Sequence, residues 1–475
     1  MIPKISIIAA AAENISSACI TATVNNAEAL ALSEPEKAFL EQKFEKEDIC
    51  SINRYPHFIF FGKIKSEKLP YQKSEMARVA GNTLFDTLKN TGEKTVQLFN
   101  FSEPNLLLPF LEGLLLASYR FDKYKKEKDD FLIHEIRICD TQITEKQITE
   151  LANTTKAVFV ARSLVNEPLS YLTAPKFSEE IEKLSSEASF TLEVFNKKKI
   201  EALKMGGLLA VNKGSIDPPT FNILEWKPEN TTSSQTIVLV GKGIVYDTGG
   251  LSLKPTPNSM DYMKADMGGA AAVVSAIYAA ALNKLPIHIV GLVPATDNRP
   301  DGNAYVPGDI ITMFDGTTVE IKNTDAEGRL ILADALSYAK KYNPQLVIDC
   351  ATLTGAADIV AGPHAAVVMG NSEQHLSALK EAGLKTFERL IEVPLWEEYA
   401  APLKSPIADL NNLGTREGQS TIAGKFLEHF TSYNWIHVDM AGTAFRKEKD
   451  AYRPSGGTGY GTRLLYNYLK TLTIQ

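Results

Sequence analysis

The second half of the chain alternates short apolar runs, typical of buried strands, with longer helical patterns. The strand-like runs lie at 236–241, 287–293, 345–351 and 435–440. The helical patterns lie at 268–285, 328–342, 372–390 and 459–472. Because the strand-like runs are almost continuous in Val, Ile and Leu, they predict an α/β fold with a mostly parallel central sheet that helices cover on both faces. Ligands bind beyond the carboxyl ends of the strands in such sheets, so functional residues are expected there.

The first 142 residues predict a smaller N-terminal α/β domain. Strand-like segments at 57–64 and 94–101 precede a helical-looking segment at 106–121. A long helical pattern at 143–167 then ends before Pro168, which is typical of a helix terminus. We expect this helix to link the N-terminal domain to a C-terminal catalytic domain at 168–475. A chain of 475 residues is long enough for two or three domains.

Composition indicates a globular protein without a membrane span. Hydrophobic residues make up 44% and charged residues 23%, and we find no apolar run that approaches the roughly 18 residues of a transmembrane helix. The apolar start resembles a signal peptide, but Glu13 interrupts it early, and an opening strand is the better interpretation. The four cysteines are scattered without a CxxC pair, which favours a reducing cytoplasm; they are Cys19, Cys50, Cys139 and Cys350.

The charge balance gives no reason to expect nucleic acid or an anionic membrane as a partner. The formal net charge is −7, and an acidic protein does not attract a polyanion through its net charge. The densest basic run, at 123–130, contains its own acids and predicts a solvated loop or hairpin.

Four carboxylates follow the predicted strands or precede the next helix: Asp247, Asp266, Asp325 and Glu327. Such crowding is costly unless a divalent cation, or two ions that share carboxylates, neutralises it. Oxygen ligands suit Mg²⁺ or Mn²⁺, and Zn²⁺ also accepts carboxylates. Lys242 and Lys254 lie in the same glycine-rich stretch as the first of these acids.

The segment 323–330, NTDAEGRL, concentrates the charge. In an extended segment Asp325 and Glu327 would point the same way because they are two residues apart. Arg329 would lie in the first helical turn, where a cation opposes the helix dipole, so a bound anion or a negatively charged transition state would explain it. Taken alone, the segment also fits a turn with Thr324 or Asp325 as the helix cap.

Other motifs in the sequence support alternative functions less well than the carboxylates support a metal site. The Asp-Thr-Gly at 247–249 resembles an aspartic protease, which needs a second copy, and 314–317 is a poor one. The segment 417–426 resembles a phosphate loop, but its spacing is one residue too long and Phe426 replaces the Ser or Thr that would meet Mg²⁺. His437 and Cys350, each in a strand-like run, are better explained as core residues than as functional ones.

Five segments, in their order and spacing, make the chain resemble the leucyl (cytosol) aminopeptidase family of dinuclear metallopeptidases: 240–255, 260–273, 291–309, 323–336 and 351–356. Further similarity reaches from about residue 160 to the C-terminus, whereas the first 140 or so residues match loosely. The segment that contains NTDAEGRL is highly specific to the family.

The resemblance implies a role for each matching residue. One metal ion would be bound by Lys242, Asp247, Asp266 and Glu327, and the other by Asp247, Asp325 and Glu327. A neutral Lys amine as a ligand requires a lowered pKa. Lys254 and Arg329 would be the catalytic pair, with bicarbonate held at Arg329. The substrate contacts would be Met263, Thr352, Leu353 and Gly355.

The resemblance also implies the reaction and the assembly. A hydroxide activated by two ions, Mn²⁺ or Zn²⁺, would remove an N-terminal leucine or other apolar residue from a peptide with a free N-terminus. The family is usually hexameric. Tyr246 and Val306 depart from residues common in the family, which leaves side-chain preference and metal exchange open. Two alternatives stay open: a specialised Cys-Gly dipeptidase, and a DNA-binding or regulatory role beside the peptidase.

Overall fold

The computed structural model describes residues 2–24, 30–229, 231 and 236–473. The chain divides into two compact units. Unit 1 comprises Met1–Lys156 and Glu448–Pro454, and unit 2 comprises Ala157–Lys447 and Ser455–Gln475. Helix α4 (Glu145–Asn166) carries the chain from the first unit into the second.

A nine-stranded sheet forms the centre of unit 2. Its order is β16 (Arg389–Glu392), β15 (Ala365–Gly370), β18 (Trp435–Asp439), β14 (Leu346–Ala351), β9 (Thr236–Gly241), β11 (His288–Asn298), β8 (Thr220–Trp226) and β7 (Thr191–Phe195), and β10 (Gly243–Asp247) pairs with β11. The central pairs β18–β14, β14–β9 and β9–β11 are parallel, whereas β7–β8, β8–β11 and β15–β18 are antiparallel. The predicted mostly parallel α/β fold is therefore confirmed.

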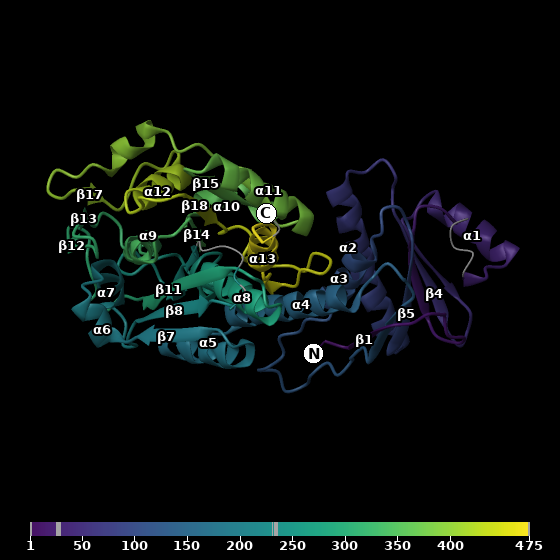
Figure 1. Cartoon of the computed structure of the whole chain (residues 1–475). Helices are drawn as coiled ribbons and strands as arrows, with labels where there is room; N and C mark the ends of the chain where they lie inside the picture. Colours follow the sequence, from purple (N-terminus) through teal and green to yellow (C-terminus); the bar gives the residue numbers. More distant parts are fainter. Residues whose placement is uncertain (1, 25–29, 230, 232–235, 474–475) are drawn as a thin grey trace. The chain divides into compact units, whose positions relative to one another are not determined.

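Helices pack on both faces of this sheet (Figure 1). One apolar core includes residues of α5 (Ala174–Ala188), α8 (Gly268–Leu282), α11 (Glu373–Thr386) and α13 (Thr462–Thr471). A second core includes residues of α6 (Lys197–Ala202), α7 (Gly206–Asn212), α9 (Gly328–Ala339) and α12 (Gln419–Glu428). Shorter elements surround them: α10 (Gly355–Ala361), β12 (Ile310–Thr312), β13 (Thr318–Glu320), β17 (Leu410–Asn411), β19 (Phe445–Arg446) and β20 (Gly456–Gly457).

The apolar stretch that ends in α8 corrects one expectation. Met260–Leu282 is long and apolar enough to cross a membrane, although we expected no run of that kind. However, 94% of its most apolar window is buried inside the protein. The many alanines and glycines let neighbouring strands approach this helix closely, so its hydropathy reflects burial in the core of unit 2.

Strand β11 is longer than the predicted run at 287–293 and ends at Asn298. Its second part pairs with β10, with Gly243 opposite Ala295 and Asp247 opposite Asn298. This extension carries Asn298 to the end of the sheet where the acidic residues gather.

Unit 1 contains a six-stranded sheet in the order β1 (Lys4–Ile7), β6 (Glu135–Ile138), β5 (Thr95–Phe101), β2 (Ser17–Thr21), β4 (Phe58–Lys63) and β3 (Ile49–Asn53). All neighbours are parallel except β3 and β4. The apolar start is thus a strand, and the basic run at 123–130 is an exposed loop, both as predicted. Helices α2 (Pro70–Thr91) and α3 (Leu107–Ala117) share one core with the sheet, and α1 (Glu34–Phe44) shares another.

Helices α2 and α3 pack with their backbones close together. A Cβ atom added at Gly81 would overlap the carbonyl oxygen of Phe110, and one at Gly113 would overlap that of Arg78. Only glycine allows this approach.

The late segment 448–454 belongs to unit 1 and binds to α2. The hydroxyl of Tyr452 donates a hydrogen bond to Oε2 of the buried Glu75 at 2.8 Å, and Nη2 of Arg453 lies 2.7 Å from Oε1 of the same side chain. Unit 1 is therefore built from two parts of the sequence that are almost 300 residues apart.

Candidate metal centre

Three of the predicted acids converge at one end of the unit 2 sheet. Asp247 ends β10, and Asp325 and Glu327 precede α9. One ligand oxygen from each lies within 4.8 Å of the others. The segment that contains Asp325 forms a turn, in which the N–H of Ala326 donates to the carbonyl of Asn323, instead of the extended strand that we expected. The carboxylates of Asp325 and Glu327 still lie together beside Asp247, because the turn leads directly into α9.

Lys242 joins the fourth acid to this group. Its Nζ lies 2.8 Å from Oδ1 of Asp266 and 3.0 Å from Oε1 of Glu327, and it donates a hydrogen bond to the carbonyl of Thr352 at 2.8 Å. A Cβ atom at Gly328 would lie 2.6 Å from Cε of Lys242, so a larger residue there would displace the Lys242 side chain from this position. Burial alone would lower the pKa of Lys242, but the surrounding carboxylates outweigh it and raise the pKa above its ordinary value.

Lys254 lies on the other side of Asp247 and Asp325. Its Nζ is 3.0 Å from Oδ2 of Asp247 and 2.5 Å from Oδ1 of Asp325. Burial again opposes the charge, but the nearby carboxylates raise the pKa of Lys254. This side chain is therefore a cation at neutral pH.

Three of the four acids, Asp247, Asp266 and Asp325, resist ionisation, whereas Lys242 and Lys254 outweigh the effect of burial and lower the pKa of Glu327. Burial, and then the charge of Glu327, raise the pKa of Asp247 well above its ordinary value. Burial raises the pKa of Asp266 to about 7, although Lys242 counteracts it. Four carboxylates face two lysines, so negative charge is in excess when all of them are ionised.

The unsatisfied oxygens fit bound cations. Oδ2 of Asp266 and Oε2 of Glu327 are buried and have no hydrogen-bond partner among the described residues. Buried polar atoms are normally paired, and an unpaired carboxylate oxygen is a natural metal ligand. The donor set, rich in carboxylate oxygens and with one amine, suits Mn²⁺ or Zn²⁺.

A cavity of about 480 Å³ opens onto these groups. Its lining includes ten of the eleven site residues expected from the sequence: Lys242, Asp247, Lys254, Met263, Asp266, Asp325, Glu327, Thr352, Leu353 and Gly355. The structure thus brings the expected metal ligands and substrate contacts together around one space.

Arg329 is the exception, because it does not line this cavity. It lies in the first turn of α9, as predicted, and its side chain is buried. Nη1 donates a hydrogen bond to the carbonyl of Asn412 at 2.8 Å, and the guanidinium lies 6.0 Å from the ring centre of Phe426. Burial lowers the pKa of Arg329 to about 10.

Several residues that hold the site in place by hydrogen bonds were not predicted from the sequence. Nδ2 of Asn298 donates to Oδ1 of Asp247 at 2.8 Å and to the carbonyl of Thr324 at 3.0 Å, and the hydroxyl of Tyr305 donates to the same carbonyl at 2.7 Å. Asp439 ends β18 and accepts a hydrogen bond from the N–H of Leu353 at 3.0 Å. The rule that ligand-binding groups lie at the carboxyl ends of parallel strands would have found Asp439, at the end of the predicted run 435–440. It would not have found Asn298, because the predicted run at 287–293 ends before it.

His437 lies in the core, as we expected from its strand. It is fully buried, and its Nδ1 lies 2.6 Å from Oδ1 of Asp349. The indole N–H of Trp435 donates to the other oxygen of that carboxylate at 2.7 Å. Cys350 is also buried in β14, where burial raises the pKa of its thiol.

Comparison with known proteins agrees with this geometry. Residues 159–466 match the model of the cytosol aminopeptidase family, catalytic domain. A probable cytosol aminopeptidase of Chlorobium limicola is 45% identical over 377 residues, covering 76% of this chain and 74% of that protein. A probable cytosol aminopeptidase of Geotalea uraniireducens is 39% identical over 449 residues, covering 90% of each.

Solved structures show the same fold. The bottromycin maturation enzyme BotP in complex with Mn matches with a TM-score of 0.86 and 29% identity, over 97% of this chain and all of that one. A tomato leucine aminopeptidase variant matches with a TM-score of 0.87 and 27% identity, over 99% of this chain and 97% of that one.

The fold and the acidic centre define a hydrolase of the metal-dependent peptidase class. The chain belongs to the cytosol aminopeptidase family. The resemblance found in the sequence is therefore confirmed.

Proposed function

We propose that the protein is an aminopeptidase that removes leucine or another apolar residue from the free N-terminus of peptides, with the help of two divalent cations. The observation that carries this proposal is the convergence of four acids and Lys242 on one cavity, with buried carboxylate oxygens that have no hydrogen-bond partner in the part of the chain that the structure describes. Family membership supports it.

The chain offers enough ligands for two ions, Mn²⁺ or Zn²⁺. Lys242, Asp247, Asp266 and Glu327 would hold one, and Asp247, Asp325 and Glu327 would hold the other. Ions bound in this way supply Lewis acidity and lower the pKa of water. Lys242 would have to lose its proton to become a ligand, so metal uptake at this position would release a proton.

The remaining residues orient and stabilise the substrate. The charged Nζ of Lys254 lines the cavity and can donate a hydrogen bond to the oxygen of the scissile carbonyl as negative charge develops there. Arg329 is buried at a helix N-terminus, and its Nε has no hydrogen-bond partner among the described residues, which suits bicarbonate as a bound anion. This anion would accept and return a proton during the reaction.

The cavity wall favours an apolar side chain on the substrate. Met263 and Leu353 contribute apolar surface, as do the rings of Tyr262 and Phe445, whose centres lie 5.6 Å apart. Thr352 and Gly355 line the same cavity. We propose that residues 168–475 carry the catalytic role, because all the proposed metal ligands belong to this range.

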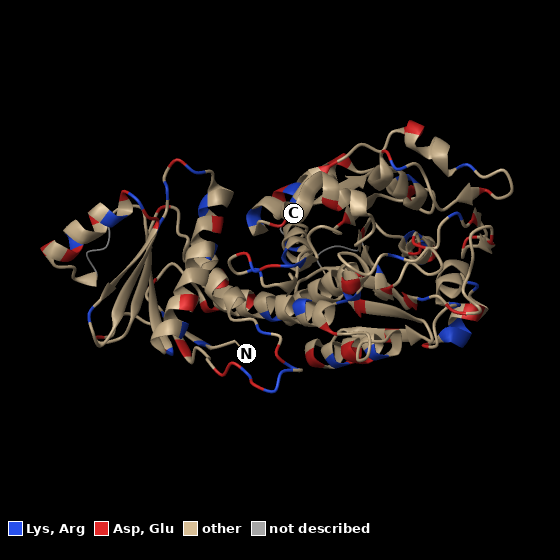
Figure 2. Cartoon of the chain, turned by 180° about the vertical axis from the view of Figure 1, so that it is seen from behind, with Lys and Arg blue, Asp and Glu red and all other residues tan. Residues whose placement is uncertain are grey.

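We further propose a cytoplasmic homohexamer without a membrane partner, and we do not expect nucleic acid as its main partner. Figure 2 shows Lys and Arg interleaved with Asp and Glu over both units, in keeping with the acidic net charge of −7. Such interleaving supports no role in binding a polyanion.

The test is hydrolysis of leucine p-nitroanilide by metal-stripped protein, with Mn²⁺ or Zn²⁺ added back. We expect activity to return with metal in the wild type and to stay absent in Asp325→Asn. Asp315→Asn, in an exposed turn, is the matched control and should behave as the wild type. Full activity in Asp325→Asn, or in metal-stripped protein, would overturn the proposal.

A further inference from the structure

The cavity of the metal centre contains a fifth acid that is not among the proposed metal ligands. Asp358 lies on α10, three residues after Gly355, and both residues line the cavity. Residues three apart in a helix lie on the same face, so Asp358 continues the wall that Gly355 begins. This acid therefore belongs to the part of the cavity that we propose for the side chain of the residue removed.

The carboxylate of Asp358 lies beside the segment 441–445. A Cβ atom added at Gly442 would lie 2.7 Å from Oδ1 of Asp358, so this oxygen is close to the backbone of the segment. Ala441, Ala444 and Phe445 of the same segment line the cavity. The acid and these apolar side chains thus form one wall.

The carboxylate of Asp358 is available to a ligand. Asp358 is an exposed residue, and its carboxylate takes part in no hydrogen bond or ion pair within the described ranges 2–24, 30–229, 231 and 236–473. An acid early in a helix can stabilise the helix N-terminus. Here the hydroxyl of Thr354 already accepts a hydrogen bond from the N–H of Ala357 at 3.2 Å, so the start of α10 is capped without Asp358.

The lysines near this wall are held by other groups. Lys242 and Lys254 lie against the acids of the metal centre. Lys447 lies outside the lining, where its Nζ donates a hydrogen bond to Oδ1 of Asn258 at 2.9 Å and is 4.8 Å from the ring centre of Tyr262. A cationic ligand group would therefore not have to displace any of these three lysines from Asp358.

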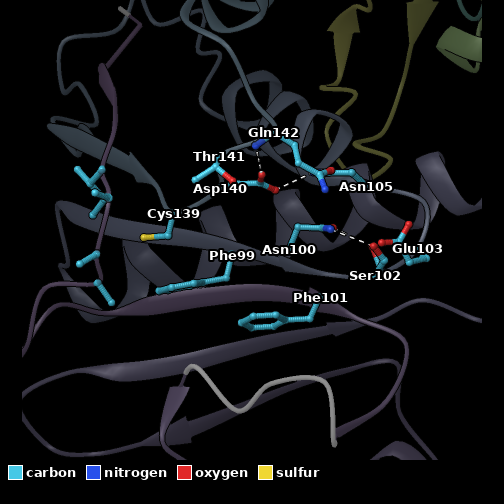
Figure 3. A pocket seen from close by; sticks show the side chains of 14 residues that line it. Phe99, Asn100, Phe101, Ser102, Glu103, Asn105, Cys139, Asp140, Thr141 and Gln142 are labelled. Atoms are coloured by element: carbon cyan, nitrogen blue, oxygen red, sulfur yellow. Dashed lines mark hydrogen bonds between the residues drawn. The ribbon is translucent and has the colours of Figure 1, made fainter.

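An acid at a second cavity provides a contrast. This cavity, of about 650 Å³, lies in unit 1 at the carboxyl ends of β1, β5 and β6. In its lining, Oδ1 of Asp140 accepts a hydrogen bond from the N–H of Gln142, and Oδ2 accepts one from Nδ2 of Asn105, both at 2.7 Å (Figure 3). Protein donors thus hold Asp140 in place, whereas the described residues leave Asp358 open to a ligand.

We propose that Asp358 allows the enzyme to remove lysine and arginine from the N-terminus of peptides, in addition to apolar residues. This inference rests on the proposed function. The aliphatic stem of such a side chain packs on the apolar wall that includes Met263 and Phe445, and its cationic end reaches Asp358. There the carboxylate pairs with the ammonium or guanidinium group through charge-assisted hydrogen bonds. An apolar side chain such as that of leucine uses the apolar wall alone.

The test compares the hydrolysis of lysine p-nitroanilide and norleucine p-nitroanilide by the full-length, metal-loaded protein. The two substrates differ only by the terminal ammonium group, so the ratio of their kcat/KM values isolates the effect of that charge. Partial unfolding of a variant cancels in the ratio. We expect Asp358→Asn to lower the lysine-to-norleucine ratio about fivefold, the upper end for a partly exposed ion pair.

Asp261→Asn is the matched control. Asp261 is exposed and precedes Tyr262 in the chain, but it does not line the cavity, so the ratio should equal that of the wild type. An unchanged ratio in Asp358→Asn, or an equal fall in both variants, would contradict the inference. Hydrolysis of leucine but not lysine p-nitroanilide by the wild type would contradict it as well. Hydrolysis of neither would contradict the proposed function itself, and this inference with it.

Discussion

Both units place a cavity at the carboxyl ends of parallel strands, but the two cavities carry different charges. In unit 2 four carboxylates and two lysines crowd together, and within residues 2–24, 30–229, 231 and 236–473 two buried carboxylate oxygens there, Oδ2 of Asp266 and Oε2 of Glu327, have no hydrogen-bond partner. In unit 1 the carboxylate of Asp140 is already held by protein donors, and no cation lines the space. Sheet topology thus determines where a cavity forms, whereas the side chains after each strand determine how much unpaired negative charge it gathers.

The largest test of this comparison is Glu327→Gln. The change keeps the size of the side chain but removes a charge that faces Lys242 and the other acids. We expect kcat/KM for leucine p-nitroanilide to fall at least about a hundredfold, since even the outer partners of metal ligands contribute about 10–100-fold. The control is Glu320→Gln, a buried acid of β13 that pairs with Lys322. Equal losses in both variants would show that burial, and not the metal centre, sets the effect.

A packing change should affect unit 1 without touching the chemistry of unit 2. Gly81→Ala places a methyl group against the carbonyl of Phe110, and overpacking of this kind costs about 1–3 kcal/mol. All three tryptophans, Trp226, Trp396 and Trp435, lie in unit 2, so urea unfolding followed by tryptophan fluorescence reports that unit, and circular dichroism reports both.

We expect the circular dichroism midpoint of Gly81→Ala to fall more than the fluorescence midpoint. Gly302→Ala is the control, because a Cβ atom there meets nothing within 4 Å. Identical shifts by both probes would show that the two units unfold as one.

The pH dependence of the free energy of unfolding tests the raised pKa of Asp334, a buried acid that is not among the proposed metal ligands. Asp334 is fully buried in α9 and accepts hydrogen bonds from the N–H groups of Leu208 and Phe314, both at 2.9 Å. Burial nevertheless raises its pKa to about 7. Because the folded pKa is above the unfolded one, this carboxyl contributes stability below about pH 4 that is lost as the pH rises through about 7.

The expected result is a difference between wild type and Asp334→Asn that changes with pH. The free energy of unfolding of the wild type, relative to the variant, should fall between about pH 4 and 7 by at most about 1.4 kcal/mol per pH unit. Urea unfolding at several pH values, without added metal, measures it. A constant difference over this range would contradict the raised pKa.

The smallest effect concerns a surface pair of unit 1. Nε and Nη2 of Arg54 donate to the two carboxylate oxygens of Glu36, each at 2.8 Å. This hydrogen bonding is the main cause that lowers the pKa of Glu36 to about 2, so its stability contribution is present above about pH 4 and is lost as the pH falls through about 2.

Arg54→Met should cost about 0.5–1 kcal/mol at pH 7, within the range of partly exposed ion pairs. Lys37→Met, which removes the more exposed pair with Glu34, should cost less. Urea unfolding followed by circular dichroism at pH 7 and pH 3 compares them. A loss for Arg54→Met that does not shrink at pH 3 would mean that packing of the arginine, and not its charge, is lost.

The sequence allowed the metal centre to be located but not its details. Asp247, Asp325 and Glu327 were predictable because the ends of parallel strands meet at one edge. Lys242 was expected only from the family resemblance, since no spacing rule indicates that a helix will begin with a glycine, Gly328, next to the end of its side chain. Asn298 was missed because the apolar run ended at residue 293, while pairing with β10 continues the strand.

The cavity of unit 1 could not be predicted from the sequence, because it also depends on how distant strands pair. Its walls are the end of β5 and short segments that follow β1, β5 and β6, and none of them contains a motif. Phe99 and Phe101 are indistinguishable from ordinary strand residues in the sequence. Strand order, which depends on pairing between distant segments, brings Asp140 to the same end as these rings.

The return of residues 448–454 to unit 1 has a consequence for biosynthesis. A ribosome makes the first 156 residues early, including Glu75 and its helical neighbour Arg78. Two further partners of Glu75, Tyr452 and Arg453, emerge only when about 95% of the chain has been made. Until then a buried carboxylate of α2 lacks them, so the amino-terminal unit cannot reach its final state during translation. A premature stop codon near the 3′ end of the message would therefore damage the part of the protein that was synthesised first.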